Sequence, residues 1–409
     1  MVLNTVPISD GPLAEIDLVS LGAASGLLWR SPTTTLVGIG EVTEVSLGVT
    51  SGAIELSEAL ESRRGENAVA VPGSGPVAFS ALPFDRDALG RAQLPDIIIG
   101  QVGTERFVTA PSDVDLANIA EHAVGHMSIA SDPMPKSISV KPSMPVSTWR
   151  DEVVAAACRR LDGSEMQKAV FARELDLQAN ADFPVARIVC DLGRRFPATM
   201  LFAIDGFIGA SPELLVSRSD RTVRAHPLAG TASRSEDPVV DAARIEGLRA
   251  SAKDRIEHRI TIDWLLAELL PFCSYVDAEP DPSVLSIANV HHLGTLVEGV
   301  LSAPAASVLD LVCAVHPTPA LGGDPQSDAL ALIEELEGFD RGRYGGPSGW
   351  VDVEGNGEFA VSVRTVDIDG SCARVCAGVG VVAQSNPDDE LLETQAKFRA
   401  ILGSILNPR

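Results

Sequence analysis

The stretch GVGVVAQSNPDDELLETQAK, residues 378–397, predicts a buried strand followed by a long helix. Its apolar, β-branched run at 379–382 is typical of a strand inside a core. Asn386 is a favourable helix N-cap, and Pro387 suits the first helical turn, where its missing N–H costs nothing. The chain therefore turns from a sheet into a helix at this point.

One face of that helix is charged. Glu390, Glu393 and Lys397 recur at spacings of three and four residues, so their side chains share a face. Most such triplets are ion pairs in solvent. The same arrangement would also suit the wall of a cleft, and the helix alone does not decide between the two.

The length suits two or three ordinary domains or one large one, and the composition predicts an acidic, cytoplasmic protein. The chain has 409 residues and a formal net charge of −24, which disfavours nucleic-acid and anionic-membrane partners. No apolar run approaches the length of about 20 residues that a membrane helix needs, and no secretory signal is evident. Six cysteines without paired spacing predict free thiols in a reducing compartment. We expect a monomer.

Residues 1–145 and 146–409 differ in character, although both fit one domain over 1–409. The first part carries no catalytic motif, and we interpret it as a divergent scaffold half. Elements expected outside the motifs are strands at 35–39, 68–71, 97–103 and 188–192, a helix at 55–64, a linker or surface loop at 132–145 and one long helical region from 241 to about 270.

Several residues in 146–409 suit chemistry, and each also has an ordinary structural interpretation. Lys168 opens an apolar strand, where a lysine usually marks the solvated edge. Glu213 stands among apolar neighbours, as a turn residue or as a general acid with a raised pKa. Arg364 ends an apolar strand, and such an arginine usually pairs with a carboxylate.

Two further segments suggest anion or metal binding. The Gly230-Thr231 turn offers amides and a hydroxyl to a carboxylate. Glu257 and His258 are adjacent on a helix without the HExxH pattern of zinc proteases. Glu257 together with Glu393 would suit Mg²⁺, which prefers carboxylates from separate elements and keeps several waters. His258 could equally be a structural histidine.

An ordered set of motifs resembles the chorismate-utilising enzymes. The segments are SPELLV, HPLAGT, KDRIEH, HHLGT, HPTPALGG, RGRYGG, GWVD, GEFAVSVR, AGVG and ELLETQAK, and their order and spacing match across 165–403. The resemblance implies an α/β (α+β) fold of the anthranilate synthase component I type, with two large packed β-sheets surrounded by helices. The family includes isochorismate, salicylate, anthranilate and aminodeoxychorismate synthases.

Four residues separate these activities. Lys168 matches the lysine that activates water in isochorismate and salicylate synthases, and ammonia-using relatives lack it. Ala229 stands where aminodeoxychorismate synthases typically carry a nucleophilic lysine. The pair Ala320 and Leu321 matches isochorismate synthases, whereas salicylate synthases tend to have a hydroxyl residue at the first position. The resemblance therefore favours an isochorismate synthase.

The resemblance also implies residue roles for chorismate and Mg²⁺. Lys168 would be the general base and Glu213 the general acid, while Glu257 and Glu393 would hold the metal ion and Glu390 would act on it through water. The implied substrate-binding residues are Gly230, Thr231, His292, Ala320, Leu321, Tyr344, Arg364, Gly378 and Lys397.

Two alternatives stay open at this point. A salicylate synthase would form the same intermediate and then eliminate pyruvate, and a decayed homologue would bind chorismate without converting it. The sequence leaves open whether the product enters menaquinone, siderophore or salicylate biosynthesis.

Overall fold

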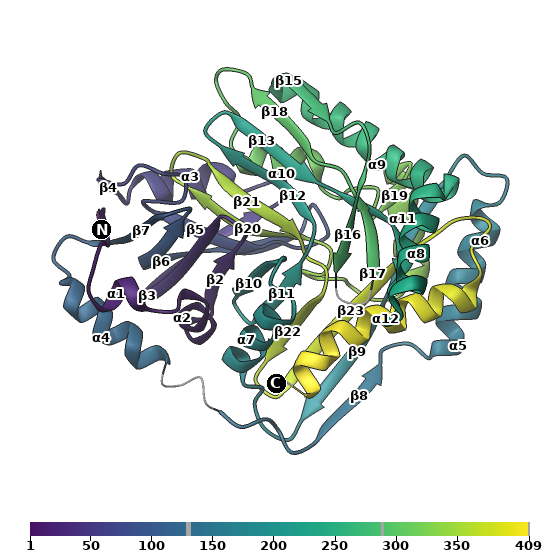
Figure 1. Cartoon of the computed structure of the whole chain (residues 1–409), viewed down its shortest axis with the longest axis horizontal. Helices are drawn as coiled ribbons and strands as arrows, with labels where there is room; N and C mark the ends of the chain where they lie inside the picture. Colours follow the sequence, from purple (N-terminus) through teal and green to yellow (C-terminus); the bar gives the residue numbers. More distant parts are fainter. Residues whose placement is uncertain (128–131, 288–289, 408–409) are drawn as a thin grey trace.

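The structure, a computed structural model, describes residues 1–127, 132–287 and 290–407. Most strands in these residues belong to one hydrogen-bonded network of 20 strands, which divides into two arms (Figure 1). The larger arm runs, in order of pairing, through β4 (Arg64–Asn67), β1 (Leu3–Pro7), β7 (Glu105–Pro111), β6 (Leu89–Val102), β3 (Thr34–Gly48), β2 (Leu27–Arg30), β10 (Met200–Ile204), β11 (Phe207–Ser211), β22 (Thr365–Asp369), β23 (Cys372–Val381) and β9 (Lys168–Ala179), with β8 (Ile138–Pro142) and β19 (Gly323–Asp324) both paired to β9.

The smaller arm runs through β5 (Val77–Ala81), β20 (Pro347–Asp352), β21 (Gly357–Val361), β12 (Leu214–Ser219), β13 (Thr222–His226), β18 (Val297–Leu301) and β15 (Cys273–Ala278). The two arms join where β5 pairs with the first half of β6, at Phe79 opposite Gln93. The long antiparallel pair of β3 and β6 bends at Gly40, whose φ of +86° lies in the left-handed region that glycine adopts without strain. Two large sheets therefore share one bent pair of strands.

A separate three-stranded sheet consists of β14 (Leu228–Ser233), β17 (Val290–Gly294) and β16 (Ser283–Ile287). Helices α8 (Pro238–Ala250) and α9 (Ala252–Leu269) pack against it. The C-terminal helix α12 (Pro387–Leu406) runs along β23, as Figure 1 shows in yellow. The remaining helices are α1 (Pro12–Glu15), α2 (Leu18–Ser25), α3 (Ala53–Glu61), α4 (Leu116–Met127), α5 (Val146–Thr148), η2 (Trp149–Val154), α6 (Ala155–Leu161), α7 (Val185–Arg195), η3 (Leu270–Phe272), α10 (Val308–Val315) and α11 (Gln326–Glu337).

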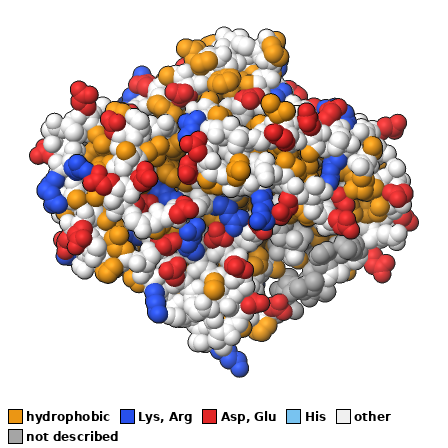
Figure 2. Space-filling view, turned by 180° about the vertical axis from the view of Figure 1, so that it is seen from behind, with side chains coloured by type: hydrophobic (Ala, Val, Ile, Leu, Met, Phe, Trp, Pro, Cys, Tyr) orange, Lys and Arg blue, Asp and Glu red, His pale blue; other side chains and the backbone are white. Residues whose placement is uncertain are grey.

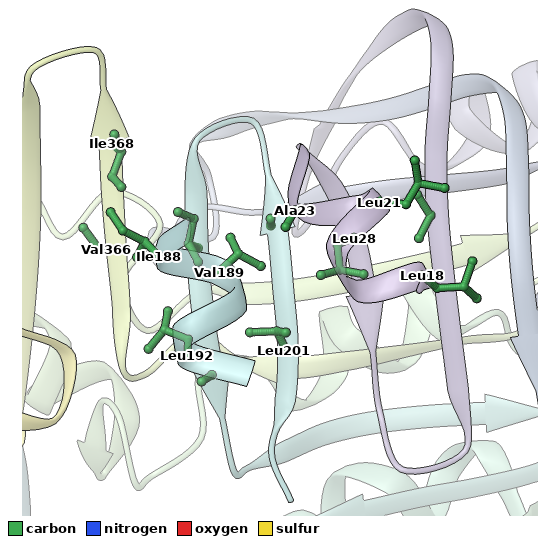
Figure 3. Close-up of a cluster of buried hydrophobic side chains, with 14 of the residues drawn as sticks. Leu18, Leu21, Ala23, Leu28, Ile188, Val189, Leu192, Leu201, Val366 and Ile368 are labelled. Atoms are coloured by element: carbon green, nitrogen blue, oxygen red, sulfur yellow. The ribbon is translucent and has the colours of Figure 1, made fainter. Parts of the chain in front are cut away.

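The largest hydrophobic core lies where α2 and α7 cover the larger arm (Figure 3). Leu21 of α2 and Leu192 of α7 are fully buried, together with Leu28 and Leu201 from the strands beneath them. Burying a leucine contributes about 1.5–3 kcal/mol, so this cluster holds the two helices firmly against the sheet.

The predicted strand-to-helix turn is confirmed. β23 ends at Val381, and α12 begins at Pro387 with the Asn386 side chain accepting a hydrogen bond from the Asp388 amide. The capping residue and the proline together fix the start of this helix.

Four other predictions were wrong or incomplete. Residues 68–71 form no strand; residues 188–192 lie in α7, because their buried positions recur with helical spacing. The predicted linker 132–145 contains β8, an edge strand that tolerates proline at its end. The long helical region is two helices, since Ser251 ends α8 and caps α9 through the Asp254 amide.

The surface agrees with the acidic composition. Figure 2 shows Asp and Glu side chains scattered over one face rather than gathered into a single patch. Within the described ranges, no helix is both long enough and apolar enough to cross a membrane.

Candidate active site

A cavity lies between the larger arm, the three-stranded sheet and the helices α9 and α12. Every predicted site residue except Glu390 lines it. The lining residues come from parts of the chain as far apart as Lys168 and Lys397, so the fold assembles the predicted site. Glu390 lies one turn before Glu393 on α12 and has other interactions.

Lys168 enters the cavity from the first residue of β9. Its Nζ donates to Glu257 Oε1 of α9 at 2.5 Å, and both side chains are largely buried, with 12% and 25% exposure. The backbone of Gly380 lies against the lysine side chain, and a Cβ at this position would collide with Lys168 Cε. Lys168 is therefore a buried cavity residue with a fixed position, not the solvated edge charge that such a lysine usually is.

Glu213 is the buried carboxyl of the cavity. It precedes β12 and is 6% exposed, and its Oε1 finds no hydrogen-bond partner in the part of the chain that the structure describes. Burial raises its pKa to about 7, although the Leu228 amide and the nearby Lys168 and Arg364 charges oppose the shift. Such a group holds a proton near neutral pH and can donate it to a ligand.

Arg364, His292 and Thr231 form a hydrogen-bonded row. Arg364 Nη2 lies 3.2 Å from His292 Nε2, and His292 Nδ1 lies 3.1 Å from Thr231 Oγ1. Because a guanidinium only donates, His292 accepts at Nε2 and carries its proton on Nδ1. Burial and the Arg364 charge lower the pKa of His292 to about 3, so the ring is neutral.

A second nitrogen of the Arg364 guanidinium, Nη1, is buried without a hydrogen-bond partner among the described residues. Burial lowers the pKa of Arg364 to about 10, which still leaves it charged at neutral pH. A buried cationic donor that faces a cavity is suited to an anionic ligand. Arg364 does not end a strand as predicted: it follows β21 with a φ of +55° and lies just before β22.

The α12 side of the cavity carries a second cation. Lys397 Nζ donates to the Gly378 carbonyl at 2.8 Å and pairs with Glu393 at 2.8 Å. The Tyr344 hydroxyl hydrogen-bonds with the Gly378 backbone, and burial raises the pKa of this phenol. The charged face predicted for α12 thus has both characters, since its ion pair also lines a cleft.

Comparison with known proteins identifies the family. The model of the family described as chorismate binding enzyme matches residues 11–406. The chain belongs to the chorismate-binding enzyme family. Its relatives include two isochorismate synthases of Bacillus subtilis, DhbC and MenF, and each is 34% identical to this chain. The alignment with DhbC covers 80% of this chain and 80% of DhbC. The alignment with MenF covers 81% of this chain and 75% of MenF.

Two solved structures have the same fold. The crystal structure of DhbC from Bacillus anthracis superposes with a TM-score of 0.80 at 30% identity, covering 97% of this chain and 99% of DhbC. Anthranilate synthase component I of Streptococcus pneumoniae superposes with a TM-score of 0.73 at 20% identity, over 91% and 93% of the two chains. The predicted α/β fold of the anthranilate synthase component I type is therefore confirmed.

The donor set of this chorismate-binding enzyme fits Mg²⁺. Glu257 of α9 and Glu393 of α12 line the same cavity and offer carboxylate oxygens from separate elements. Magnesium typically takes one or two carboxylates and keeps several waters, so two direct ligands suffice. The described residues contain no group of three His, Cys, Asp or Glu side chains arranged around a common point.

Sequence reasoning missed part of the cavity wall. Val170, Val363, Ala377, Val379 and Gly380 line the cavity but were not predicted as site residues. Gly380 carried a signal, because it lies two residues after Gly378 on the same strand and so faces the same side. The valines resembled ordinary core positions and carried none.

Proposed function

We propose that this chorismate-binding enzyme is a Mg²⁺-dependent isochorismate synthase, which adds water at C2 of chorismate and removes the C4 hydroxyl. The observation that carries the proposal is the presence of Lys168 and the protonatable Glu213 in one cavity with buried cations. The relatives named isochorismate synthase support it.

In the proposed reaction, Lys168 acts from its neutral form and takes a proton from the attacking water. The oxygen of that water bonds to C2, and both ring double bonds shift: C1=C2 becomes C1=C6, and C5=C6 becomes C4=C5 as the bond from C4 to its hydroxyl breaks. Glu213 gives its proton to the departing hydroxyl, which leaves as water. One water enters and one leaves, so the overall change is an isomerisation.

The dianionic substrate needs positive groups in a protein of net charge −24. Arg364 has an unused donor and would bind the enolpyruvyl carboxylate, with Tyr344 and Lys397 beside it. His292 would orient that carboxylate indirectly, because it accepts from Arg364 and donates to Thr231.

A bound Mg²⁺ would supply positive charge to the ring carboxylate. Glu257 and Glu393 would hold it directly, and Glu390, just outside the cavity lining, would interact through water. Gly230 and Thr231 would line this side of the substrate. Ala320 and Leu321 would form the apolar wall near the reacting carbons.

Product analysis tests the proposal. The purified protein is incubated with chorismate, with and without MgCl₂, and the products are separated by chromatography. Isochorismate formed only with the metal supports the proposal. Salicylate and pyruvate would identify a salicylate synthase, and unconsumed chorismate would identify a non-catalytic binding protein.

Lys168→Ala assigns the base. We expect the variant to lose isochorismate formation while its far-UV circular dichroism and thermal midpoint stay close to those of the wild type. Near-normal turnover by this variant would rule out water activation by Lys168.

A further inference from the structure

A buried ion pair lies behind the cavity wall. Glu337, the last residue of α11, accepts from Arg341 Nε at 2.6 Å and from Arg341 Nη2 at 2.7 Å, and the side chains are 2% and 3% exposed. Neither residue lines the cavity. Burying two charges has a large desolvation cost, and such pairs often add little to stability. The hydrogen bonds that this pair makes to the backbone therefore point to a role other than stability.

Those other contacts go to the backbone of two segments that line the cavity. Arg341 Nη1 donates to the Leu321 carbonyl at 3.0 Å, and Nη2 donates to the Val170 carbonyl at 2.6 Å. Glu337 Oε2 accepts from the Ala172 amide at 2.7 Å. The planar guanidinium thus connects the loop 316–322 to β9 in one rigid fork.

The same loop and strand enclose Lys168. The Val170 amide donates to the Gly322 carbonyl at 3.0 Å, the Gln167 amide donates to the Asp324 carbonyl at 2.8 Å, and Asp324 pairs with Lys168 in the β19–β9 ladder. Arg341 therefore fixes the strand two residues beyond Lys168, at the point where the loop leaves the ladder.

The N-terminal half completes this arrangement. The Arg341 guanidinium lies 4.4 Å from the centroid of the Phe84 ring, a cation–π contact. The Phe84 amide donates to the Gly342 carbonyl at 2.7 Å, and the Phe84 carbonyl accepts from His316 Nε2 at 2.9 Å. His316 begins the loop, so Phe84 holds the loop and the arginine together.

We propose that Arg341, supported by Glu337 and Phe84, is a positioning residue that sets the location of the Lys168 amine through β9 and the loop 316–322. This inference rests on the proposed function of Lys168 as the base. It assigns a role in the reaction to a residue of the N-terminal half, which the sequence had suggested only as scaffold.

The test compares Arg341→Lys with a matched control, Arg195→Lys. Arg195 also pairs with a buried carboxylate four residues earlier, Asp191, and also donates to backbone carbonyls, those of Gly403 and Asn407. None of these four residues lines the cavity. Lysine keeps the charge in both variants but cannot reproduce the fork.

We expect Arg341→Lys to lower kcat about 100-fold while KM for chorismate changes less than about threefold, because a misplacement of about 1 Å can cost this much. Arg195→Lys should lower the thermal midpoint less, because the Arg195 side chain is 27% exposed against 3% for Arg341 and Asp191 also pairs with Arg194, and it should leave kcat within about threefold of the wild type. Glu337→Gln is a second variant that keeps an acceptor for the Ala172 amide but leaves the buried Arg341 charge without its carboxylate, so it should lower the thermal midpoint and lower kcat about tenfold. Wild-type kcat in Arg341→Lys, or equal kcat losses in Arg341→Lys and Arg195→Lys, would overturn the proposal.

Crystal structures of the wild type and Glu337→Gln give a readout independent of turnover. We expect the Lys168 amine to be displaced relative to Glu213 in the variant, and an unchanged amine position would overturn the proposal. If the wild type forms no isochorismate, the proposed function fails, and the crystallographic comparison still decides the positioning role.

Discussion

Replacing Glu213 with glutamine should stabilise the protein at alkaline pH. The Glu213 carboxyl is buried, and its pKa is raised from 4.5 to about 7. Between these values the unfolded chain releases the proton while the folded chain retains it, so stability falls as pH rises. At about 1.4 kcal/mol for each tenfold change in proton affinity, the difference between these two pKa values corresponds to a loss of about 3 kcal/mol in folding stability. The full loss is reached above about pH 7. Glutamine has no proton to lose and keeps an oxygen that can accept from the Leu228 amide.

Urea denaturation of both proteins at about pH 4.5 and about pH 8 measures this effect. We expect the free energy of unfolding of the wild type, relative to Glu213→Gln, to fall by about 3 kcal/mol between the two pH values. Glu55→Gln, at an exposed position of α3, controls for the loss of one surface charge. A difference between wild type and Glu213→Gln that does not change with pH would refute the reasoning, since it would mean that the buried carboxyl titrates normally.

Three further predictions concern activity. Gly380→Ala should lower kcat at least about tenfold with the fold intact, because the new methyl group displaces the Lys168 side chain, and normal kcat would show that the lysine has room to move. Glu393→Gln should shift the Mg²⁺ titration of activity to higher concentration, and an unchanged titration would remove Glu393 from the proposed metal site. Arg364→Lys should raise KM for chorismate by about tenfold or more, because hydrogen bonds to charged groups contribute about 1.5–3 kcal/mol, and an unchanged KM would show that Arg364 does not bind the substrate.

Local sequence signals predicted local structure well where several of them agreed. The cap at Asn386, the proline at Pro387 and the apolar run before them all indicated one turn, and that turn is present. The strand predicted at 188–192 is a helix, because the buried positions in this segment fit both the strand period and the helical period. Five residues are too few to separate the two periods. A longer window would have shown the i, i+4 pair of Asp191 and Arg195.

The site residues were predicted from the resemblance, but their interactions were not. No local pattern indicates that Lys168 meets Glu257, or that Phe84 stacks on Arg341, because these contacts join segments far apart in the chain. They depend on how the two arms and the separate sheet pack together.

The three-stranded sheet has a consequence for ligand binding. Within the described residues, no strand pairing joins it to the 20-stranded network, yet the two bodies share the cavity. The sheet contributes Thr231 and His292 and supports the helix that carries Glu257, while the network contributes Lys168. Hydrogen bonds and packing between side chains, not a ladder, thus fix the distance between these groups. A ligand that contacts both bodies would act as a cross-link, so its binding free energy would also resist their separation during unfolding.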